Sequence, residues 1–576
     1  MVTCTINNIT VQVPEGTTIM EAAAKANIHI PHLCFLKDLN EIAACRVCCV
    51  EVEGERAMVT ACNNPVSEGM VIHTNSPRAR KTRRTNVQLI LSQHDFHCAT
   101  CVRSGTCKLQ AIANDLGILE VPYEQQLPKG LRGAWTTTFP LYHDYAKCIK
   151  CMRCIQVCDK MQSVHIWDVA GTGSRTTIDV SNNRVIKDSD CVLCGQCITH
   201  CPVAGLRERD DTEKVYDALA DPDKVVICQV APAVRTAWCE QFGLSRQQGT
   251  INRMAAALRR LGFDHVYDTT FSADLTIMEE ASEFIHRFTS GGLDRYPMFT
   301  SCCPGWVRFI KGQYPELTGQ LSTSKSPQQM FGAIAKTWLA QKLGVPPEKL
   351  FLVSIMPCLA KKAECALPTM RTEHGPDVDV VLTTRELIRM LRADAIDPKD
   401  LPEEPLDSPM GAYTGAGSIF GTTGGVMEAA LRSAYAFLTG TNPDPDMFAA
   451  IRLGPGLREA TYEIKGIKVR CAAVSGLANT RELLEALKRK EKAYDFVEVM
   501  ACPGGCAGGG GQPIHKEDGE LAATRSEELR FLDENNPMRF SHENPEIQQL
   551  YNEFLGRPLS ELAEKLLHTD HFGWKM

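Results

Sequence analysis

The stretch "CIKCMRCIQVC", residues 148–158, carries four cysteines at the spacing C-x2-C-x2-C-x3-C. Residues 191–201, "CVLCGQCITHC", repeat the same spacing and are followed by Pro202. Thiolates at this spacing are the usual ligands of 4Fe-4S clusters. The repeat therefore predicts one domain that holds two such clusters.

The expected ligand sets follow from bacterial two-cluster ferredoxins, which these two runs resemble. In those domains the fourth cysteine of each run ligates the other cluster. One cluster is therefore expected on Cys148, Cys151, Cys154 and Cys201, and the other on Cys191, Cys194, Cys197 and Cys158. The alternative, a pair of zinc knuckles, seldom uses two crossing runs. Asp159 stands where the second run has proline, which is a small departure.

The length, net charge and cysteine count limit the class of protein. A chain of 576 residues predicts about four domains of roughly 150 residues each. The net charge of −7 disfavours general nucleic-acid binding. The 26 cysteines of so large a chain indicate metal or redox chemistry rather than disulfides. The sequence shows no secretory signal and no apolar run of about 18 residues, so we expect a cytoplasmic protein without a membrane span.

A third group of candidate ligands lies in "HDFHCATCVRSGTC", residues 94–107. His94, Cys98, Cys101 and Cys107 offer an imidazole and three thiolates, which suit either a tetrahedral zinc ion or an iron–sulfur cluster. The spacing alone does not choose between these metals, nor between His94 and His97. The neighbouring two-cluster domain favours a 4Fe-4S cluster.

The N-terminus reads as strand, turn, strand and helix. Asn7-Asn8 and Glu15-Gly16 supply turn residues, and the helix is expected to begin after Thr17 or Thr18. The cysteines that follow are Cys34, Cys45, Cys48 and Cys62. Their spacing differs from the plant pattern because ten residues separate the first pair, yet the segment resembles a β-grasp 2Fe-2S ferredoxin domain with a longer loop. Cys49 is interpreted as a bystander.

After residue 225 the pattern changes to alternating strands and helices, which is typical of an α/β fold. Apolar runs at 224–234, 349–358 and 377–384 predict buried strands. Cysteines then occur in "TSCCPGW" (300–306), "MPCLAKKAE" (356–364) and "EVMACPGGCAGGGGQP" (498–513), at strand ends or in loops. Such positions are where α/β folds place their chemistry. The glycines at 508–511 are expected to allow a close backbone approach.

These three stretches, in this order and spacing, resemble the active-site signatures of the FeFe-hydrogenases. The upstream cluster array resembles that of the long, clostridial-type members, so the resemblance covers essentially the whole chain. It implies an H-cluster, in which a 4Fe-4S cubane is joined to a two-iron subsite carrying CO, cyanide and azadithiolate. The implied cubane ligands are Cys303, Cys358, Cys502 and Cys506, with Cys506 as the bridge.

The resemblance also implies a proton route. Adjacent residues of an extended chain point to opposite sides, so Cys302 and Cys303 are not expected to ligate the same iron. Cys302 matches the free thiol beside the open iron site, and the remaining route residues are Glu280, Ser322, Glu283 and Arg287. On spacing alone, Glu280 and Glu283 share one face of a helix, and a solvated acidic face is the plainer interpretation.

The surroundings of the subsite follow from the same resemblance. Lys361 matches the lysine that donates to one cyanide, and backbone amides near Pro232 and Ala233 serve the other. The family often has serine where this chain has Ala233, so a hydroxyl contact is absent there. Met356 and Met500 match soft apolar walls around the subsite.

The sequence thus predicts a multidomain α+β and α/β protein. The expected domains are a 2Fe-2S domain (1–79), a 4Fe-4S domain with one His and three Cys ligands (80–125), a two-cluster ferredoxin domain (138–212), and a two-lobed α/β catalytic domain with a C-terminal helical segment (224–576). The expected cofactors are one 2Fe-2S cluster, three accessory 4Fe-4S clusters and the H-cluster. The function implied is reversible reduction of protons to H2.

The expected partners are a ferredoxin, or an NAD(P)H-dehydrogenase-type flavoprotein with small 2Fe-2S subunits, together with maturation proteins. The basic run "SPRARKTRRTN" (76–86) is interpreted as a solvated helix face, with a docking patch for an acidic electron carrier as the alternative. Two rival functions remain, an electron-transfer subunit like that of respiratory complex I and a sensory or assembly relative. No role is assigned to Cys4, Cys49, Cys228, Cys239, Cys365 and Cys471.

Overall fold

The N-terminal part is a five-stranded sheet with one helix against it. A computed structural model of the protein describes residues 1–130, 135–291, 296–452, 456–515 and 521–576. The strand order is β2-β1-β5-β3-β4, formed by β1 (Val2–Ile6), β2 (Ile9–Val13), β3 (Cys49–Val52), β4 (Val59–Thr60) and β5 (Val71–His73). Asn7 and Asn8 both adopt positive φ, as a tight hairpin requires. Helix α1 (Ile19–Lys25) begins with a Thr18–Glu21 capping box, so the predicted start is confirmed.

The middle of the chain repeats its structure where it repeats its sequence. Each cysteine run contains two residues with positive φ, Lys150 and Met152 in the first and Leu193 and Gly195 in the second. Each then enters a one-turn helix, α4 (Arg153–Gln156) or α5 (Gln196–Thr199). The surrounding elements are α2 (Pro77–Leu91), α3 (Lys108–Asp115), and the pairs β6 (Leu141–His143) with β9 (Leu206–Glu208) and β7 (Trp167–Ala170) with β8 (Thr177–Val180).

The basic run lies at the start of α2, and its interpretation as a solvated face is wrong for one residue. Arg83 is 5% exposed and donates to the carbonyl oxygens of Val47, Cys49 and Thr74. This arginine is buried because three backbone acceptors replace its water.

The C-terminal half contains two four-stranded sheets. The first is all parallel, with order β11-β10-β13-β16, and the second has order β12-β19-β18-β17 with only β17 antiparallel. The strands of the first sheet are β10 (Val225–Val230), β11 (His265–Asp268), β13 (Leu350–Met356) and β16 (Val380–Thr383). The strands of the second sheet are β12 (Met298–Phe299), β17 (Leu457–Ile464), β18 (Ile467–Ser475) and β19 (Phe496–Met500). The three strands predicted at 224–234, 349–358 and 377–384 are confirmed in the parallel sheet.

Helix α9 (Thr269–Thr289) joins the two lobes. Phe271 and Leu275 belong to the core of the parallel sheet, whereas Ile277 and Phe284 belong to the core against β19. The helix packs on α11 (Pro327–Ile334) and α16 (Gly425–Thr439).

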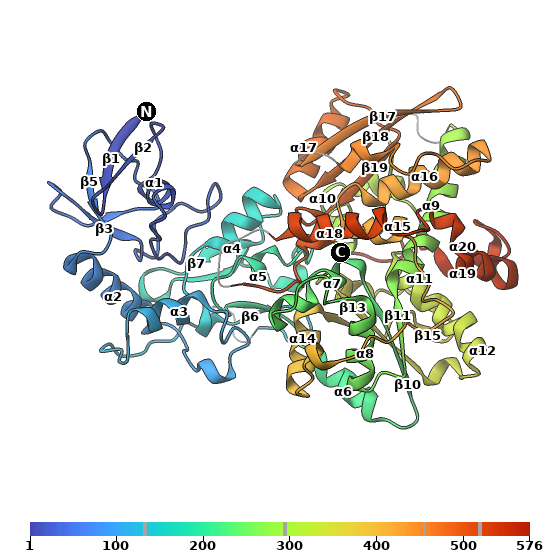
Figure 1. Cartoon of the computed structure of the whole chain (residues 1–576), viewed down its shortest axis with the longest axis horizontal. Helices are drawn as coiled ribbons and strands as arrows, with labels where there is room; N and C mark the ends of the chain where they lie inside the picture. The colour runs from blue at the N-terminus through green and yellow to red at the C-terminus, as the bar shows by residue number, and fades with distance from the viewer. Residues whose placement is uncertain (131–134, 292–295, 453–455, 516–520) are drawn as a thin grey trace.

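Figure 1 shows the N-terminal sheet at one end of the molecule, the cysteine-rich middle next to it, and the two lobes beyond. The C-terminal helices α18 (Ala522–Glu534), α19 (Pro545–Leu550) and α20 (Glu561–Leu567) lie against the lobes. No helix in the described ranges has the length and apolar character needed to cross a membrane.

Candidate active site

Both lobes contribute a strand end to one half-buried group of cysteines. Cys303 follows β12 and is the N-cap of α10 (Pro304–Gln313), Cys358 follows β13, and Cys502 and Cys506 follow β19. Their thiols lie close enough for the charge of each to act on the others. Because carboxyl ends of strands from two sheets meet here, four sulfur donors come near one another. This donor set suits a 4Fe-4S cubane.

The glycine run after Cys506 lets the backbone approach two other cysteine loops. A Cβ atom at Gly509 would lie 2.2 Å from the Pro357 carbonyl oxygen, and one at Gly510 would lie 2.3 Å from the Cys194 carbonyl oxygen. No side chain fits at either distance, so glycine at both positions allows the backbone to come close to these two loops. Cys502 Sγ also lies 3.6 Å from the Cys194 carbonyl oxygen. The ferredoxin-like part therefore touches the cysteine group of the catalytic lobes directly.

Polar side chains flank this group on the side of Cys302. Cys302 is 8% exposed, and burial, reinforced by the negative charge of Glu280, raises the pKa of its thiol well above the usual value. Lys361 is buried beside Cys358 and Cys506, and its ammonium lies 3.5 Å from Glu364. A buried ammonium beside a thiolate group offers hydrogen-bond donors to any anionic ligand bound there.

The apolar candidates line the same strand ends. Pro232 and Ala233 begin α7 (Pro232–Arg235), directly after β10, and both are buried. Met356 and Met500 are the last residues of β13 and β19, with 1% and 2% exposure. The four residues therefore lie at the same ends of the two sheets as the cysteines.

Two carboxylates on α9 lead away from Cys302. Glu280 is fully buried, and in the described part of the chain neither of its carboxylate oxygens has a hydrogen-bond partner. Burial, with the charge of Glu283 acting in the same direction, raises the pKa of Glu280 to about 8. Both side chains are buried, so the plainer interpretation of a solvated acidic face is wrong.

Glu283 connects this interior to the surface. Its carboxylate accepts from Ser322 Oγ at 2.7 Å and from the Thr323 backbone N–H, and it pairs with Arg287 Nη2 at 2.6 Å. Glu283 and Arg287 line an open surface cavity of about 580 Å³. His568 enters the same cavity and contacts Thr323 Oγ1 at 2.8 Å. Ser322, Glu283 and Arg287 are therefore linked to one another at this cavity, and Glu280 lies one turn earlier on the same helix.

The two cysteine runs form two separate cavities, each with four sulfur atoms. One cavity is lined by Cys148, Cys151, Cys154 and Cys201, and the other by Cys158, Cys191, Cys194 and Cys197. In each cavity the fourth thiol comes from the other run. These donor sets suit 4Fe-4S clusters.

The four cysteines of the predicted 2Fe-2S site also come together. The Cys34 thiol is within hydrogen-bonding reach of those of Cys45 and Cys62, and Cys48 is within reach of Cys62. His94 is 6% exposed, and its Nδ1 lies 3.0 Å from the Lys147 carbonyl oxygen. Since a carbonyl oxygen only accepts, the proton must be on Nδ1, which leaves the lone pair of Nε2 for a metal.

His97 is the unselected alternative to His94. Its side chain is 82% exposed and its Nδ1 contacts Asp95. An exposed imidazole already paired with a carboxylate is a poor fit for a buried cluster ligand, so the geometry favours His94.

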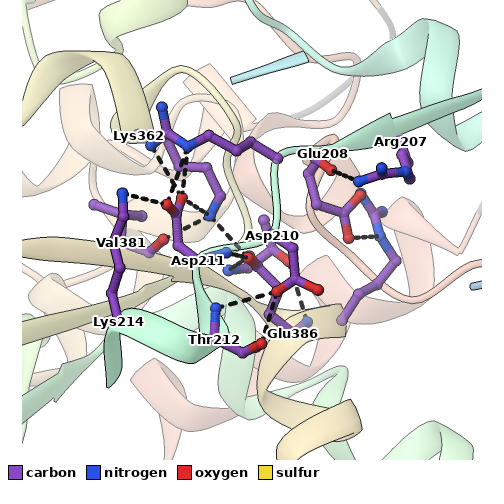
Figure 2. Close-up of polar contacts among 12 residues, drawn as sticks. Arg207, Glu208, Asp210, Asp211, Thr212, Lys214, Lys362, Val381 and Glu386 are labelled. Atoms are coloured by element: carbon purple, nitrogen blue, oxygen red, sulfur yellow. Dashed lines mark hydrogen bonds and ion pairs between the residues drawn. The ribbon is translucent and has the colours of Figure 1, made fainter. Parts of the chain in front are cut away.

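A buried polar network fixes the ferredoxin-like part to the catalytic lobes. Figure 2 shows Lys362 among Asp211, Glu386 and Val381. The Lys362 ammonium lies 2.8 Å from Asp211 and 2.9 Å from Glu386, and it donates to the Val381 carbonyl oxygen. Nearby, Arg385 pairs with Glu208 at 2.7 Å and donates to the Gly510 carbonyl oxygen. The network thus includes Lys362, which follows Lys361 in the chain, and Gly510, whose backbone approaches Cys194.

Glu498 was not predicted as a site residue, because its partners are distant in the chain. Glu498 is fully buried on β19, accepts from the Gly424 and Met427 N–H groups at 2.6 and 2.8 Å, and has its pKa raised by burial to about 7. It thereby holds the glycine-rich start of α16 beside the cysteine group. Its position in the apolar strand "FVEVM" was the available signal, since a lone acid in a buried strand needs a partner.

Comparison with known proteins identifies the class. A family model described as iron only hydrogenase large subunit, C-terminal domain, matches residues 224–510. Further models match a 2Fe-2S iron-sulfur cluster binding domain (1–77), an NADH-ubiquinone oxidoreductase-G iron-sulfur binding region (83–122), a 4Fe-4S dicluster domain (147–204) and an iron hydrogenase small subunit (519–574). The chain belongs to the iron-only hydrogenase family.

Two relatives match over nearly the whole of both chains. The NADP-reducing hydrogenase subunit HndD of Solidesulfovibrio fructosivorans is 46% identical and iron hydrogenase 1 of Clostridium pasteurianum 38% identical, each alignment covering 99% of both chains. A solved apo variant of FeFe-hydrogenase HydA1 from Chlamydomonas reinhardtii is 40% identical with a TM-score of 0.56, covering 62% of this chain and 98% of that one. The predicted family, the enzyme class and the 2Fe-2S and 4Fe-4S domains are confirmed.

Proposed function

We propose that this hydrogenase catalyses the reversible reaction 2 H⁺ + 2 e⁻ ⇌ H2. The observation that carries the proposal is the juxtaposition of four half-buried cysteines from two lobes with a buried lysine and a buried glutamate that has no hydrogen-bond partner among the described residues. When bound, the H-cluster supplies the two-iron subsite at which the H–H bond is formed or broken. The residues of the chain hold it, move protons and exclude water.

In this proposal Cys302 gives or takes the proton at the cluster side. Glu280 exchanges that proton with Cys302, Ser322 passes it on through its hydroxyl group, and Glu283 receives it. Arg287 then places a positive charge beside Glu283 at the surface cavity. The support is geometric, because these groups form a sequence in which Ser322 contacts Glu283 and Glu283 lines the cavity.

The ligand sets proposed are those expected from the sequence. Cys303, Cys358, Cys502 and Cys506 hold the cubane of the H-cluster, Lys361 and the amides near Pro232 and Ala233 donate to its cyanides, and Met356 and Met500 enclose it. Three accessory 4Fe-4S clusters are held by His94, Cys98, Cys101 and Cys107 and by the two crossed sets of the ferredoxin-like repeat. One 2Fe-2S cluster is held by Cys34, Cys45, Cys48 and Cys62, in a β-grasp domain. The corresponding domain boundaries are 1–79, 80–125, 138–212 and 224–576.

We further propose that the protein works in a multisubunit cytoplasmic assembly with an NAD(P)-linked flavoprotein and small 2Fe-2S subunits, with ferredoxin as the alternative electron carrier. The support is the relative named an NADP-reducing hydrogenase subunit, which aligns with 99% of this chain. The exposed part of the basic run on α2 suits docking of an acidic carrier. Loading of the two-iron subsite requires maturation proteins.

The test is infrared spectroscopy of anaerobically matured protein, first under argon and then under H2. Bands of metal-bound CO and cyanide that shift with H2 are expected. Their absence in fully iron-loaded, matured protein would overturn the proposal and leave an electron-transfer subunit. Cys302→Ser is then expected to keep the bands and to lose on the order of 100-fold in H2 evolution.

A further inference from the structure

One buried side chain contacts two cysteine loops that are far apart in the sequence. Asn40 is fully buried, and its Nδ2 donates to the carbonyl oxygen of Cys34 at 2.7 Å and to that of Cys151 at 2.9 Å. Cys34 belongs to the proposed 2Fe-2S ligand set and Cys151 to the proposed set of the adjacent 4Fe-4S cluster. A single amide therefore bridges the ligand loops of two clusters.

The orientation of this amide is determined by its two acceptors. Both carbonyl groups lack a proton, so the NH2 group must face them, because the flipped amide would set three oxygens against one another. In the described part of the chain Asn40 Oδ1 has no hydrogen-bond partner. A buried, unsatisfied acceptor destabilises the fold by about 1–3 kcal/mol. The fold keeps this unsatisfied acceptor while the Asn40 amide makes both bridging hydrogen bonds.

A second side chain reinforces the same contact from the opposite side. Arg153 is 1% exposed, and it donates to the Cys34 carbonyl at 3.2 Å, to the Phe35 carbonyl at 2.7 Å and to the His200 carbonyl at 3.4 Å. At the rim, Lys160 donates to the Leu39 carbonyl at 2.7 Å. The Cys34 carbonyl thus accepts from both sides of the junction, and the loop 34–40 is fixed against the segment 151–160.

We propose that Asn40 and Arg153 are positioning residues that fix the separation between the 2Fe-2S site and the site of Cys148, Cys151, Cys154 and Cys201, and with it the rate of electron transfer between these two sites. One electron is lost by one cluster and gained by the other, with no proton moved and no bond formed or broken. The inference rests on the proposed ligand sets. Rigid backbone contacts suit it, because a shift of either loop changes the separation of the two clusters.

The test compares Asn40→Leu with Asn86→Leu in the full-length protein. Asn86 Nδ2 donates to the Arg46 carbonyl at 2.8 Å, which is also on the 2Fe-2S side, but it does not reach the ferredoxin-like part. Both variants are reduced with dithionite, and the spin relaxation of the 2Fe-2S electron paramagnetic resonance signal is measured. Asn40→Leu is expected to lose the relaxation enhancement caused by the neighbouring cluster, whereas Asn86→Leu keeps it.

A kinetic measurement completes the test. In rapid-freeze experiments the 2Fe-2S cluster of Asn40→Leu is expected to be reduced by H2 at least tenfold more slowly, with H/D exchange unchanged. Unchanged relaxation and rate in Asn40→Leu, or equal losses in both variants, would overturn the inference. If Asn40→Leu does not retain its 2Fe-2S cluster, Arg153→Lys is measured in the same way and the same outcomes decide. If the proposed function is wrong, H2 will not reduce the clusters of any variant, but the spin-relaxation comparison after reduction with dithionite will still decide the inference.

Discussion

Ser322 donates its hydroxyl hydrogen to Glu283 across 2.7 Å, which ties the loop before α11 to helix α9. Glu280, one turn earlier on that helix, has no such partner for either oxygen in the described ranges. Two carboxylates on one helical face therefore have different environments. Such a pair suits proton transfer, because the desolvated group takes up a proton near neutral pH while its neighbour remains tied to donors.

Glu280→Gln should interrupt this route. The amide is nearly isosteric but cannot exchange a proton, so H2 evolution is expected to fall by about 100-fold or more. Infrared bands and iron content should not change. Glu279→Gln is the matched control, since Glu279 is equally buried on α9 but accepts from Tyr551 and the Leu559 N–H. Its folded fraction should retain activity, and an equal loss in both variants would contradict the route.

The pKa of Glu280 predicts a dependence of stability on pH. Burial raises this pKa from its ordinary value of 4.5 to about 8, so between these values the folded protein holds a proton that the unfolded chain has released. The resulting stability is complete below about pH 4.5 and is lost as the pH rises through about 8. Thermal unfolding midpoints of the wild type should therefore fall more steeply from pH 5.5 to 8.5 than those of Glu280→Gln. Parallel curves would exclude the raised pKa.

Ser322→Ala tests the hydroxyl step. We expect a loss of about 10- to 100-fold in H2 evolution, less than for Glu280→Gln because a water molecule can occupy the freed volume. Ser324→Ala serves as control, since Ser324 is buried two residues later and its Oγ has no hydrogen-bond partner among the described residues. A similar loss in both variants would indicate a general disturbance of the loop.

The sequence predicted the features that depend on local chemistry. The two cysteine runs could be read because sulfur ligands must recur at short spacing, and the helix start expected after Thr17 or Thr18 rests on an equally local signal. The spacing of Glu280 and Glu283 gave their shared helix face but not their burial, which depends on packing of α9 between both lobes. Asn40 could not be found, because its second acceptor lies 111 residues away.

Lys362 should stabilise the contact between the ferredoxin-like part and the catalytic lobes. Lys362→Met leaves Asp211 and Glu386 as buried carboxylates without their shared cation, which is expected to destabilise the protein by about 3–5 kcal/mol. Lys214→Met removes a 60% exposed partner of the same Asp211, for an expected loss of about 0–1 kcal/mol. Limited proteolysis of the holoprotein at increasing urea concentration measures both. Equal sensitivity of the two variants would exclude a structural role for the buried network.

Gly510→Ala addresses the contact through which the ferredoxin-like part meets the active site. The new methyl group would lie 2.3 Å from the Cys194 carbonyl oxygen, so the two loops must separate, at a cost of about 1–3 kcal/mol or more. Electron delivery should slow because the loops of Cys194 and Cys502 move apart, whereas H/D exchange, which needs no external electrons, should persist. Stopped-flow reduction of the accessory clusters by H2 separates the two effects. Gly312→Ala is the control, since its methyl group would meet only ordinary contacts of 3.5 Å or more; a slowing of electron delivery in this variant, or none in Gly510→Ala, would contradict the assignment.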